Sequence, residues 1–153
     1  MGMEFYGNSY KGNDEPIFVG IPTFLKLPWL RSHEELKSVR PDVAIIGEPF
    51  DFGTTIRPGA RYGPRAIRAA STVPSPPYEH FNIETGVDPF GVFRTVDYGD
   101  VNVSPGDVVE SHRRMTDKVK EVLDIDGIPV MLGGDHSITF ANVRAFAKKY
   151  KNI

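Results

Sequence analysis

The chain has 153 residues, of which 40% are hydrophobic and 25% are charged, and this balance provides enough apolar material for one hydrophobic core. Its formal net charge of -2 excludes a broadly basic surface, so we expect no nucleic-acid partner and no membrane partner. The chain has no cysteine, which excludes disulfides and thiolate metal sites, so any metal must be held by nitrogen and oxygen atoms. No apolar run approaches the ~20 residues of a membrane span and the first residues lack a signal-peptide layout, so we expect a cytoplasmic protein.

The first thirty residues or so are expected to form an arm. A polar, glycine-containing start leads into the apolar segment IFVGIPTFLKLPW, which is interrupted by Pro22 and Pro28. Neither a helix nor a central strand tolerates prolines at this spacing. We therefore expect residues 1–30 to contain an extended arm that lies on the domain or on a neighbouring subunit.

Three apolar runs predict buried strands, and the segments between and around them predict helices. The expected strands cover residues 42–47, 94–97 and 128–132. The expected helices cover residues 63–71, 104–127 and 137–150, and residues 32–40 form a short amphipathic segment that ends at Pro41. Residues 71–91 carry several prolines and are expected to form a long surface loop. This alternation of strands and helices predicts an α/β fold with a parallel sheet and right-handed crossovers.

Local signals support the helix boundaries. Pro64 stands where a helix favours its first residue, Gly127 suits the residue after a helix, and Ser137 is a candidate N-cap. The helix expected within residues 104–127 has an apolar stripe at helical spacing. Its members are Val108, Met115, Val119, Val122 and Leu123.

The segment GGDHS, directly after the third expected strand, is the strongest candidate site. Ligands of open α/β sheets bind at the carboxyl ends of the strands, and two glycines permit a sharp turn there. A lone histidine such as His136 is more often structural than a ligand, but Asp135 beside it can accept a hydrogen bond from an imidazole or from backbone donors. The alternative is that Asp135 and Ser137 cap the following helix, and both roles are compatible.

Four arginines follow the first expected strand. A solvated basic helix face accounts for Arg65 and Arg68. Arg57 and Arg61 lie in a Pro-Gly loop, where an anionic substrate and a carboxylate of the protein are equally good partners. The glycines of this loop follow neither the GxGxxG pattern nor a GKS or GKT ending, so nucleotide binding is not favoured.

Other acids and histidines give weaker signals. Asp97 and Asp100 in DYGDV could bind metal, but an ordinary turn with side-chain hydrogen bonds is the favoured interpretation. His33, His80 and His112 have no companion at metal-binding spacing, and the charged neighbours of His112 indicate an exposed side chain.

The segments FDFGTTIRPGARYGPRAIR, DYGDV and LGGDHSIT, in this order, resemble the N-terminal half of the ureohydrolases, the arginase and agmatinase family. The segment GIPTFLKLP resembles the agmatinase branch, and the match runs from about Gly20 to Phe146. The resemblance implies a three-layer α/β/α fold with a parallel sheet, assembly into trimers or hexamers, and a binuclear Mn²⁺ site that hydrolyses a guanidine to urea and an amine. It implies that His136 is a ligand of one metal ion and that Asp135 is a supporting residue, not a ligand.

The chemistry agrees with this resemblance. A guanidinium is a poor electrophile, and two bound cations lower the pKa of a bridging water so that hydroxide forms near neutral pH. Carboxylate and imidazole ligands suit manganese. For the complete protein we expect hydrolysis of agmatine to putrescine and urea, in polyamine biosynthesis. The alternatives are guanidinobutyrate, guanidinopropionate, formimidoylglutamate or arginine as substrate, or a non-catalytic binding or assembly subunit.

The sequence departs from the family pattern in its extent. The other metal ligands, from a DAHxD-type motif and a later pair of aspartates, and the general-base histidine would all lie after Ile153. We therefore expect residues 1–153 to form a single, incomplete ureohydrolase-type domain that is inactive alone. The family's sheet order implies that the third strand pairs with a strand of the C-terminal half, so its edge should be unpaired here and the isolated chain should self-associate.

Overall fold

A three-stranded parallel sheet forms the centre of the molecule. The computed structural model describes residues 18–72 and 81–153. Within them the strands are β1 (Val43–Glu48), β2 (Thr95–Asp100) and β3 (Ile128–Gly133). Their order in the sheet is β2-β1-β3, so β1 is the middle strand. The predicted α/β class and the parallel sheet are confirmed.

The strand register brings the three carboxyl ends to one edge of the sheet. Val43 pairs with Thr95 on one side and with Ile128 on the other, and the pairing with β3 continues to Glu48 opposite Gly133. The pairing with β2 shifts by one residue before Gly47, which lies opposite Asp100. Segments that follow β1 and β3 therefore start side by side, where a site can be built.

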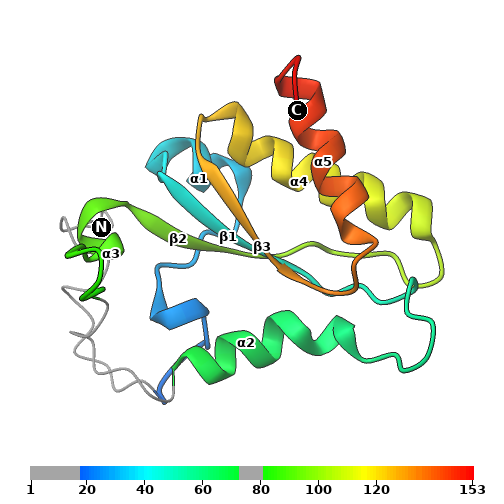
Figure 1. Cartoon of the computed structure of the whole chain (residues 1–153), viewed down its shortest axis with the longest axis horizontal. Helices are drawn as coiled ribbons and strands as arrows, with labels where there is room; N and C mark the ends of the chain where they lie inside the picture. The colour runs from blue at the N-terminus through cyan, green and yellow to red at the C-terminus, as the bar shows by residue number, and fades with distance from the viewer. Residues whose placement is uncertain (1–17, 73–80) are drawn as a thin grey trace.

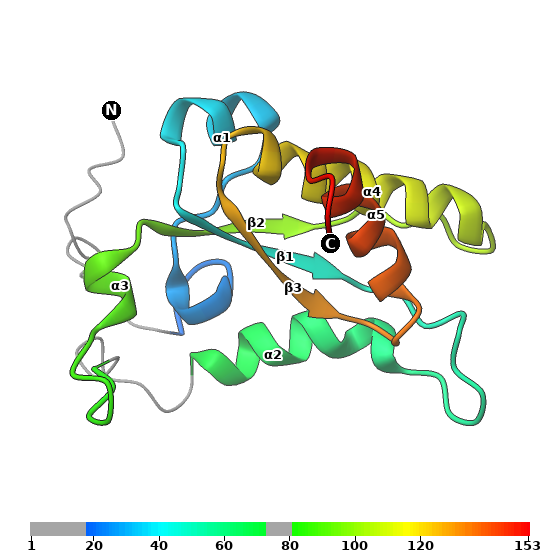
Figure 2. The same cartoon turned by 45° about the horizontal axis from the view of Figure 1, so that its top comes forward.

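Helices cover both faces of the sheet, as Figures 1 and 2 show. One face carries α2 (Gly63–Ser71), against which the short helix η1 (Phe24–Lys26) packs. The other face carries α1 (His33–Val39), α4 (Val108–Asp124) and α5 (Ile138–Lys149). This is the three-layer arrangement that the resemblance implies. Two further short helices are η2 (Ala60–Tyr62) and α3 (Pro89–Val92). None of the described helices is both long and apolar enough to cross a membrane.

The main core lies between the sheet and the layer of α1, α4 and α5. Full burial of one aliphatic side chain stabilises the fold by roughly 1.5–3 kcal/mol relative to its exposure. The cluster therefore fixes α4 and α5 against β1. Its fully buried members include Leu36, Ala44, Ile46, Val96, Met115, Val119, Val122, Ala141 and Ala145.

Most helix boundaries follow the predicted signals, with three corrections. Pro64 lies in the first turn of α2, and the side chain of Asp107 accepts a hydrogen bond from the backbone N of Glu110 at the start of α4 (2.9 Å). Val108 is 42% exposed and does not belong to the buried stripe. Gly127 is not the left-handed residue after α4, because Asp126 takes that conformation (φ 64°). Ser137 makes no side-chain cap bond to α5.

Two loop predictions also need correction. β2 continues to Asp100, so DYGD is part of the strand and not a turn after it. The predicted loop of residues 71–91 includes residues 73–80, which lie outside the described part of the chain. Its second half contains an isolated bridge between Asn82 and Val87 and the short helix α3, capped by Asp88.

The described part of the arm packs along β2. The backbone N of Leu30 donates to the carbonyl O of Asp97, and the N of Asp97 donates to the O of Pro28, both at 2.9 Å. Phe24, in the unpredicted helix η1, donates its N to Asp97 Oδ2 (2.8 Å). The arm thus covers the outer edge of β2.

Candidate functional site

The GGDHS turn leaves the end of β3 between the end of β1 and the start of α2. Gly134 has a φ of 74°, and a Cβ there would lie 2.5 Å from the carbonyl O of Glu48. A Cβ on Gly63, the first residue of α2, would collide with the carbonyl O of Gly133. Only glycine fits these positions, so the turn is held closely by its two neighbours.

Asp135 organises the turn through both carboxylate oxygens. Oδ2 accepts from the backbone N of Gly53 (2.6 Å), and Oδ1 accepts from the N and the Oγ of Ser137 (2.8 and 2.5 Å). The backbone N of Asp135 donates to the O of Phe50 (2.8 Å). The carboxylate therefore holds the turn to the loop after β1, and Ser137 serves this turn and does not cap α5.

His136 is the exposed residue of the turn. Its side chain makes no hydrogen bond or ion pair with the residues that the structure describes, so its imidazole is free to bind a ligand. Among residues 18–72 and 81–153, no three His, Asp or Glu side chains form a group that could hold a metal ion. The described residues therefore fit the contribution of one ligand to a metal centre and do not form a complete centre.

A buried carboxylate orders the loop after β1. Asp51 accepts hydrogen bonds from the N of Gly59 (2.7 Å) and the Nε of Arg61 (2.6 Å). The Arg61 side chain lowers the pKa of Asp51 to about 2, and its guanidinium lies over the Phe52 ring (5.2 Å to the centroid). For Arg61 the internal carboxylate is thus the observed partner. Arg57 is exposed and has no hydrogen bond or ion pair within the described part of the chain.

Arg68 is buried, and the expectation that it lies on a solvated face is wrong. Its guanidinium donates to both oxygens of Asp97 (2.7 and 2.9 Å) and to Asp100 (2.5 Å). A Cβ on Gly47 would collide with the Asp100 carboxylate, so glycine leaves the space that the ion pair needs. Arg65, one turn earlier, is exposed as expected. Asp97 and Asp100 therefore serve this ion-pair network.

A pocket of about 250 Å³ lies beside this network, between the arm, α2 and the end of β2. No residue of the GGDHS turn lines it, so it is separate from His136. Its walls consist of Ile21, Pro22, Thr23, Trp29, Arg65, Arg68, Asp97, Gly99 and Asp100.

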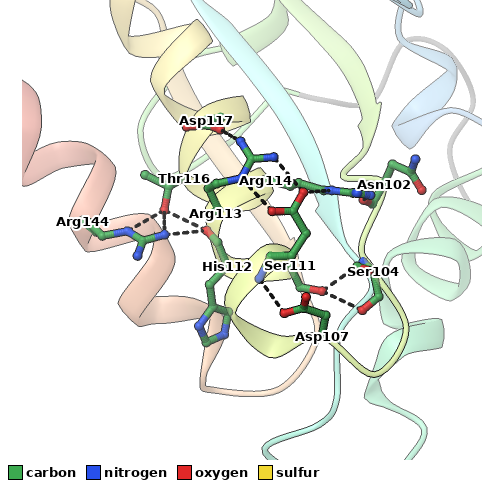
Figure 3. Close-up of polar contacts among 11 residues, drawn as sticks. Asn102, Ser104, Asp107, Ser111, His112, Arg113, Arg114, Thr116, Asp117 and Arg144 are labelled. Atoms are coloured by element: carbon green, nitrogen blue, oxygen red, sulfur yellow. Dashed lines mark hydrogen bonds and ion pairs between the residues drawn. The ribbon is translucent and has the colours of Figure 1, made fainter.

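The prediction that the His112 side chain is exposed is wrong, because it is partly buried. It lies on α4 among polar contacts that reach α5 through Arg144 (Figure 3), and its ring packs against Phe50 and Phe140 (centroids 5.2 and 6.0 Å apart). Burial lowers its pKa, and the charge of Arg144 lowers it further. His33 lies on α1, with Nδ1 3.9 Å from Glu121 Oε1. His80 lies outside the described residues.

Comparison with known proteins gives a consistent match. Residues 41–153 match the arginase family. The chain is 38% identical over 142 residues to the guanidinobutyrase of Pseudomonas aeruginosa, covering 93% of this chain and 43% of the relative. It is 39% identical over 132 residues to the mitochondrial agmatinase of Gallus gallus, covering 86% of this chain and 36% of the relative.

Solved structures give the same result. A hypothetical agmatinase from Burkholderia thailandensis superposes with a TM-score of 0.74 at 29% identity, covering 96% of this chain and 47% of that one. The proclavaminate amidinohydrolase of Streptomyces clavuligerus superposes with a TM-score of 0.71 at 35% identity, covering 89% and 42%. The chain thus spans less than half the length of these relatives.

Proposed function

The chain belongs to the arginase family, and from this premise we propose that it is the N-terminal part of a manganese-dependent hydrolase of guanidino compounds. His136 carries this proposal, because its imidazole is exposed at the carboxyl edge of the sheet and has no other partner among the described residues. In this proposal His136 is a ligand of one Mn²⁺ ion of a binuclear site.

The residues around His136 support a ligand role. A metal-binding histidine needs a rigid backbone. Loss of a group that holds a metal ligand in place commonly lowers metal affinity or activity ~10–100-fold. Asp135 supplies such rigidity by joining the turn to Gly53 and Ser137. Manganese bound there with the remaining ligands would supply an activated water for attack on the guanidine carbon.

For the substrate we propose agmatine, which would be cleaved to putrescine and urea. The relatives include proteins named for agmatine, guanidinobutyrate and guanidinopropionate, so their names agree on a guanidino group and differ in the remainder of the molecule. Guanidinobutyrate and guanidinopropionate are therefore the principal alternatives, followed by arginine and formimidoylglutamate. We further propose that the complete protein acts in the cytoplasm as a trimer or hexamer and that it binds neither nucleic acid nor a membrane.

A second candidate is a binding or assembly subunit without catalytic activity. It is favoured by one observation: His136 has no companion ligands among the described residues. For the same reason we propose that residues 1–153 alone release no urea and bind manganese weakly, because one imidazole cannot hold two divalent cations.

Urea release tests these proposals. The complete protein should be loaded with Mn²⁺ and assayed with agmatine, guanidinobutyrate, guanidinopropionate and arginine, and residues 1–153 should be assayed in parallel. We expect turnover of agmatine by the complete protein and none by the shorter chain. Preference for another compound would change the substrate assignment, and no urea from any compound would favour the non-catalytic subunit.

A further inference from the structure

Glu48 and Asn142 form a buried polar pair between the end of β1 and α5. Glu48 is 0% exposed and Asn142 is 6% exposed. The Nδ2 of Asn142 donates to Oε2 of Glu48 at 2.9 Å. The other oxygen of each side chain, Glu48 Oε1 and Asn142 Oδ1, is buried and has no hydrogen-bond partner among the described residues.

The two unpartnered oxygens belong to the same side-chain pair, and this identifies what is missing. An ionised carboxylate and an amide oxygen are both acceptors, so neither can satisfy the other. Exchanging the amide N and O of Asn142 does not help, because the amide has one NH₂ group and one oxygen in either orientation. Within the pair, only a proton on the carboxyl group can supply a donor for Asn142 Oδ1.

We propose that Glu48 is a neutral carboxylic acid in the folded protein and forms a ring of two hydrogen bonds with Asn142. In this ring the amide Nδ2 donates to one carboxyl oxygen, and the O–H of the other donates to Asn142 Oδ1. Both buried orphan oxygens are then satisfied, which removes a penalty that buried polar groups otherwise carry.

The surroundings of Glu48 favour the neutral form. Burial raises the pKa of Glu48 to about 7, and the hydrogen bond from Asn142 opposes this rise only in part. No described charged group forms an ion pair or hydrogen bond with this carboxyl. The surrounding elements carry other charged or titratable side chains that are at least partly buried, and none of them forms an ion pair or hydrogen bond with Glu48. They are Arg68 on α2, Asp97 and Tyr98 on β2, Glu110, His112, Arg114, Asp117, Lys118 and Glu121 on α4, Asp135 after β3, and Arg144 and Lys149 on α5.

The pair lies next to the turn that carries His136. The carbonyl O of Glu48 approaches Gly134 so closely that a Cβ there would lie 2.5 Å away, and α5 begins directly after the turn. On its other side α5 is attached to α4 by Arg144, which donates to the O of His112 (2.9 Å) and to Thr116 (2.8 and 3.0 Å; Figure 3). Glu48 and Asn142 are thus positioning residues that hold the start of α5 to the sheet.

This role makes the attachment of α5 sensitive to pH. The folded-state pKa of Glu48 is about 7, above the ordinary value of 4.5. The neutral pair therefore contributes stability that is fully present below pH 4.5 and is lost as the pH rises towards 7. Above this range the ionised carboxylate stays buried and can no longer donate to Asn142 Oδ1, and we expect α5 and the GGDHS turn to open more readily.

Carboxyl titration in the complete protein tests the proposal directly. With ¹³C-labelled glutamate carboxyls, NMR follows each group through the pH range, and Glu48→Gln assigns the resonance of Glu48 by its disappearance. We expect Glu48 to be protonated at about pH 6 and to ionise near pH 7. A Glu48 resonance that is ionised throughout this range, which means that another donor serves the pair, would overturn the proposal.

Stability measurements supply a second readout. Glu48→Gln keeps a neutral side chain that can form both hydrogen bonds at every pH, so its melting temperature should not share the decline of the wild type between about pH 5 and pH 7. Glu84→Gln, which changes an exposed carboxyl, is the matched control and should follow the wild type. Identical pH profiles for the wild type and Glu48→Gln would contradict the proposal. If Glu48→Gln fails to fold, the titration of the wild-type carboxyl, assigned through its coupling to the Glu48 backbone, still decides it.

Discussion

The two outer strands of the sheet differ in how their outer edges are covered. Residues 28–30 cover the edge of β2 with two backbone hydrogen bonds to Asp97. Within the described residues β3 pairs only with β1, and its residues Ile128 and Val130 are 55% and 39% exposed. An exposed apolar strand edge invites pairing with another strand, so among the described residues β3 has the edge that is open to such pairing.

The difference shows what holds each edge in place. The β2 edge is stabilised by other parts of the chain. The backbone of Asp97 pairs with the arm, and its carboxylate accepts hydrogen bonds from the backbone N of Phe24 and from the guanidinium of Arg68. The β3 edge has no such partner among the described residues. The same kind of apolar run therefore produces one protected and one unprotected strand, depending on the segments that reach it.

The largest loss of stability is expected from breaking the ion pair between Arg68 of α2 and the carboxylates of β2. In Arg68→Met the carboxylates of Asp97 and Asp100 lose their buried counter-charge, and breaking a buried pair commonly costs about 3–5 kcal/mol. Chemical unfolding of the complete protein measures this loss. Arg65→Met, on the exposed side of the same helix, is the control and should change stability by less than about 0.5 kcal/mol. Equal stability of Arg68→Met and the wild type would refute the structural role of the network.

A second effect is expected at the open β3 edge. Residues 1–153 alone should self-associate, and Val130→Lys should reduce this association because a charged residue on an edge strand opposes pairing with another strand. Val109→Lys, which replaces an exposed residue of α4, is the control and should leave association unchanged. Sedimentation velocity measures the result. A monodisperse wild-type monomer that unfolds cooperatively would show that the β3 edge needs no partner.

The smallest effect on stability is expected in the loop that follows β1, where Asp51 pairs with Arg61. The Arg61 side chain lowers the pKa of Asp51 to about 2, below its ordinary value of 3.8. This pair therefore contributes stability that is present above pH 3.8 and is lost as the pH falls towards 2. In Arg61→Met the pKa of Asp51 should rise, which NMR titration of the carboxyl detects. An unchanged pKa would assign the low value to the backbone donors of the loop.

The fold was largely predictable because its signals are local. The apolar run of β1, the position of Pro64 and the glycine pair before Asp135 each act through adjacent residues. The resemblance to ureohydrolases supplied what local signals lack, namely the layer order and the role expected of His136.

The buried polar pairs were not predictable, because their partners lie far along the chain. Arg68 pairs with Asp97, 29 residues away, and Glu48 pairs with Asn142, 94 residues away. A pattern of single residues cannot distinguish such an arginine from a solvated one. The polar residue Glu48 at the end of an otherwise apolar strand is a local signal, but the strand predicted over residues 42–47 did not include it and the signal does not identify its partner.

The central claim is that His136 contributes one ligand to a manganese site in the complete protein. Calorimetric titration with Mn²⁺ should compare the wild type with His136→Ala, and His33→Ala, on α1, is the matched histidine control. We expect His136→Ala to weaken manganese binding by ~10-fold or more while its fold, followed by circular dichroism, is retained, and we expect His33→Ala to bind as the wild type does. Equal manganese affinity of His136→Ala and the wild type would contradict the claim.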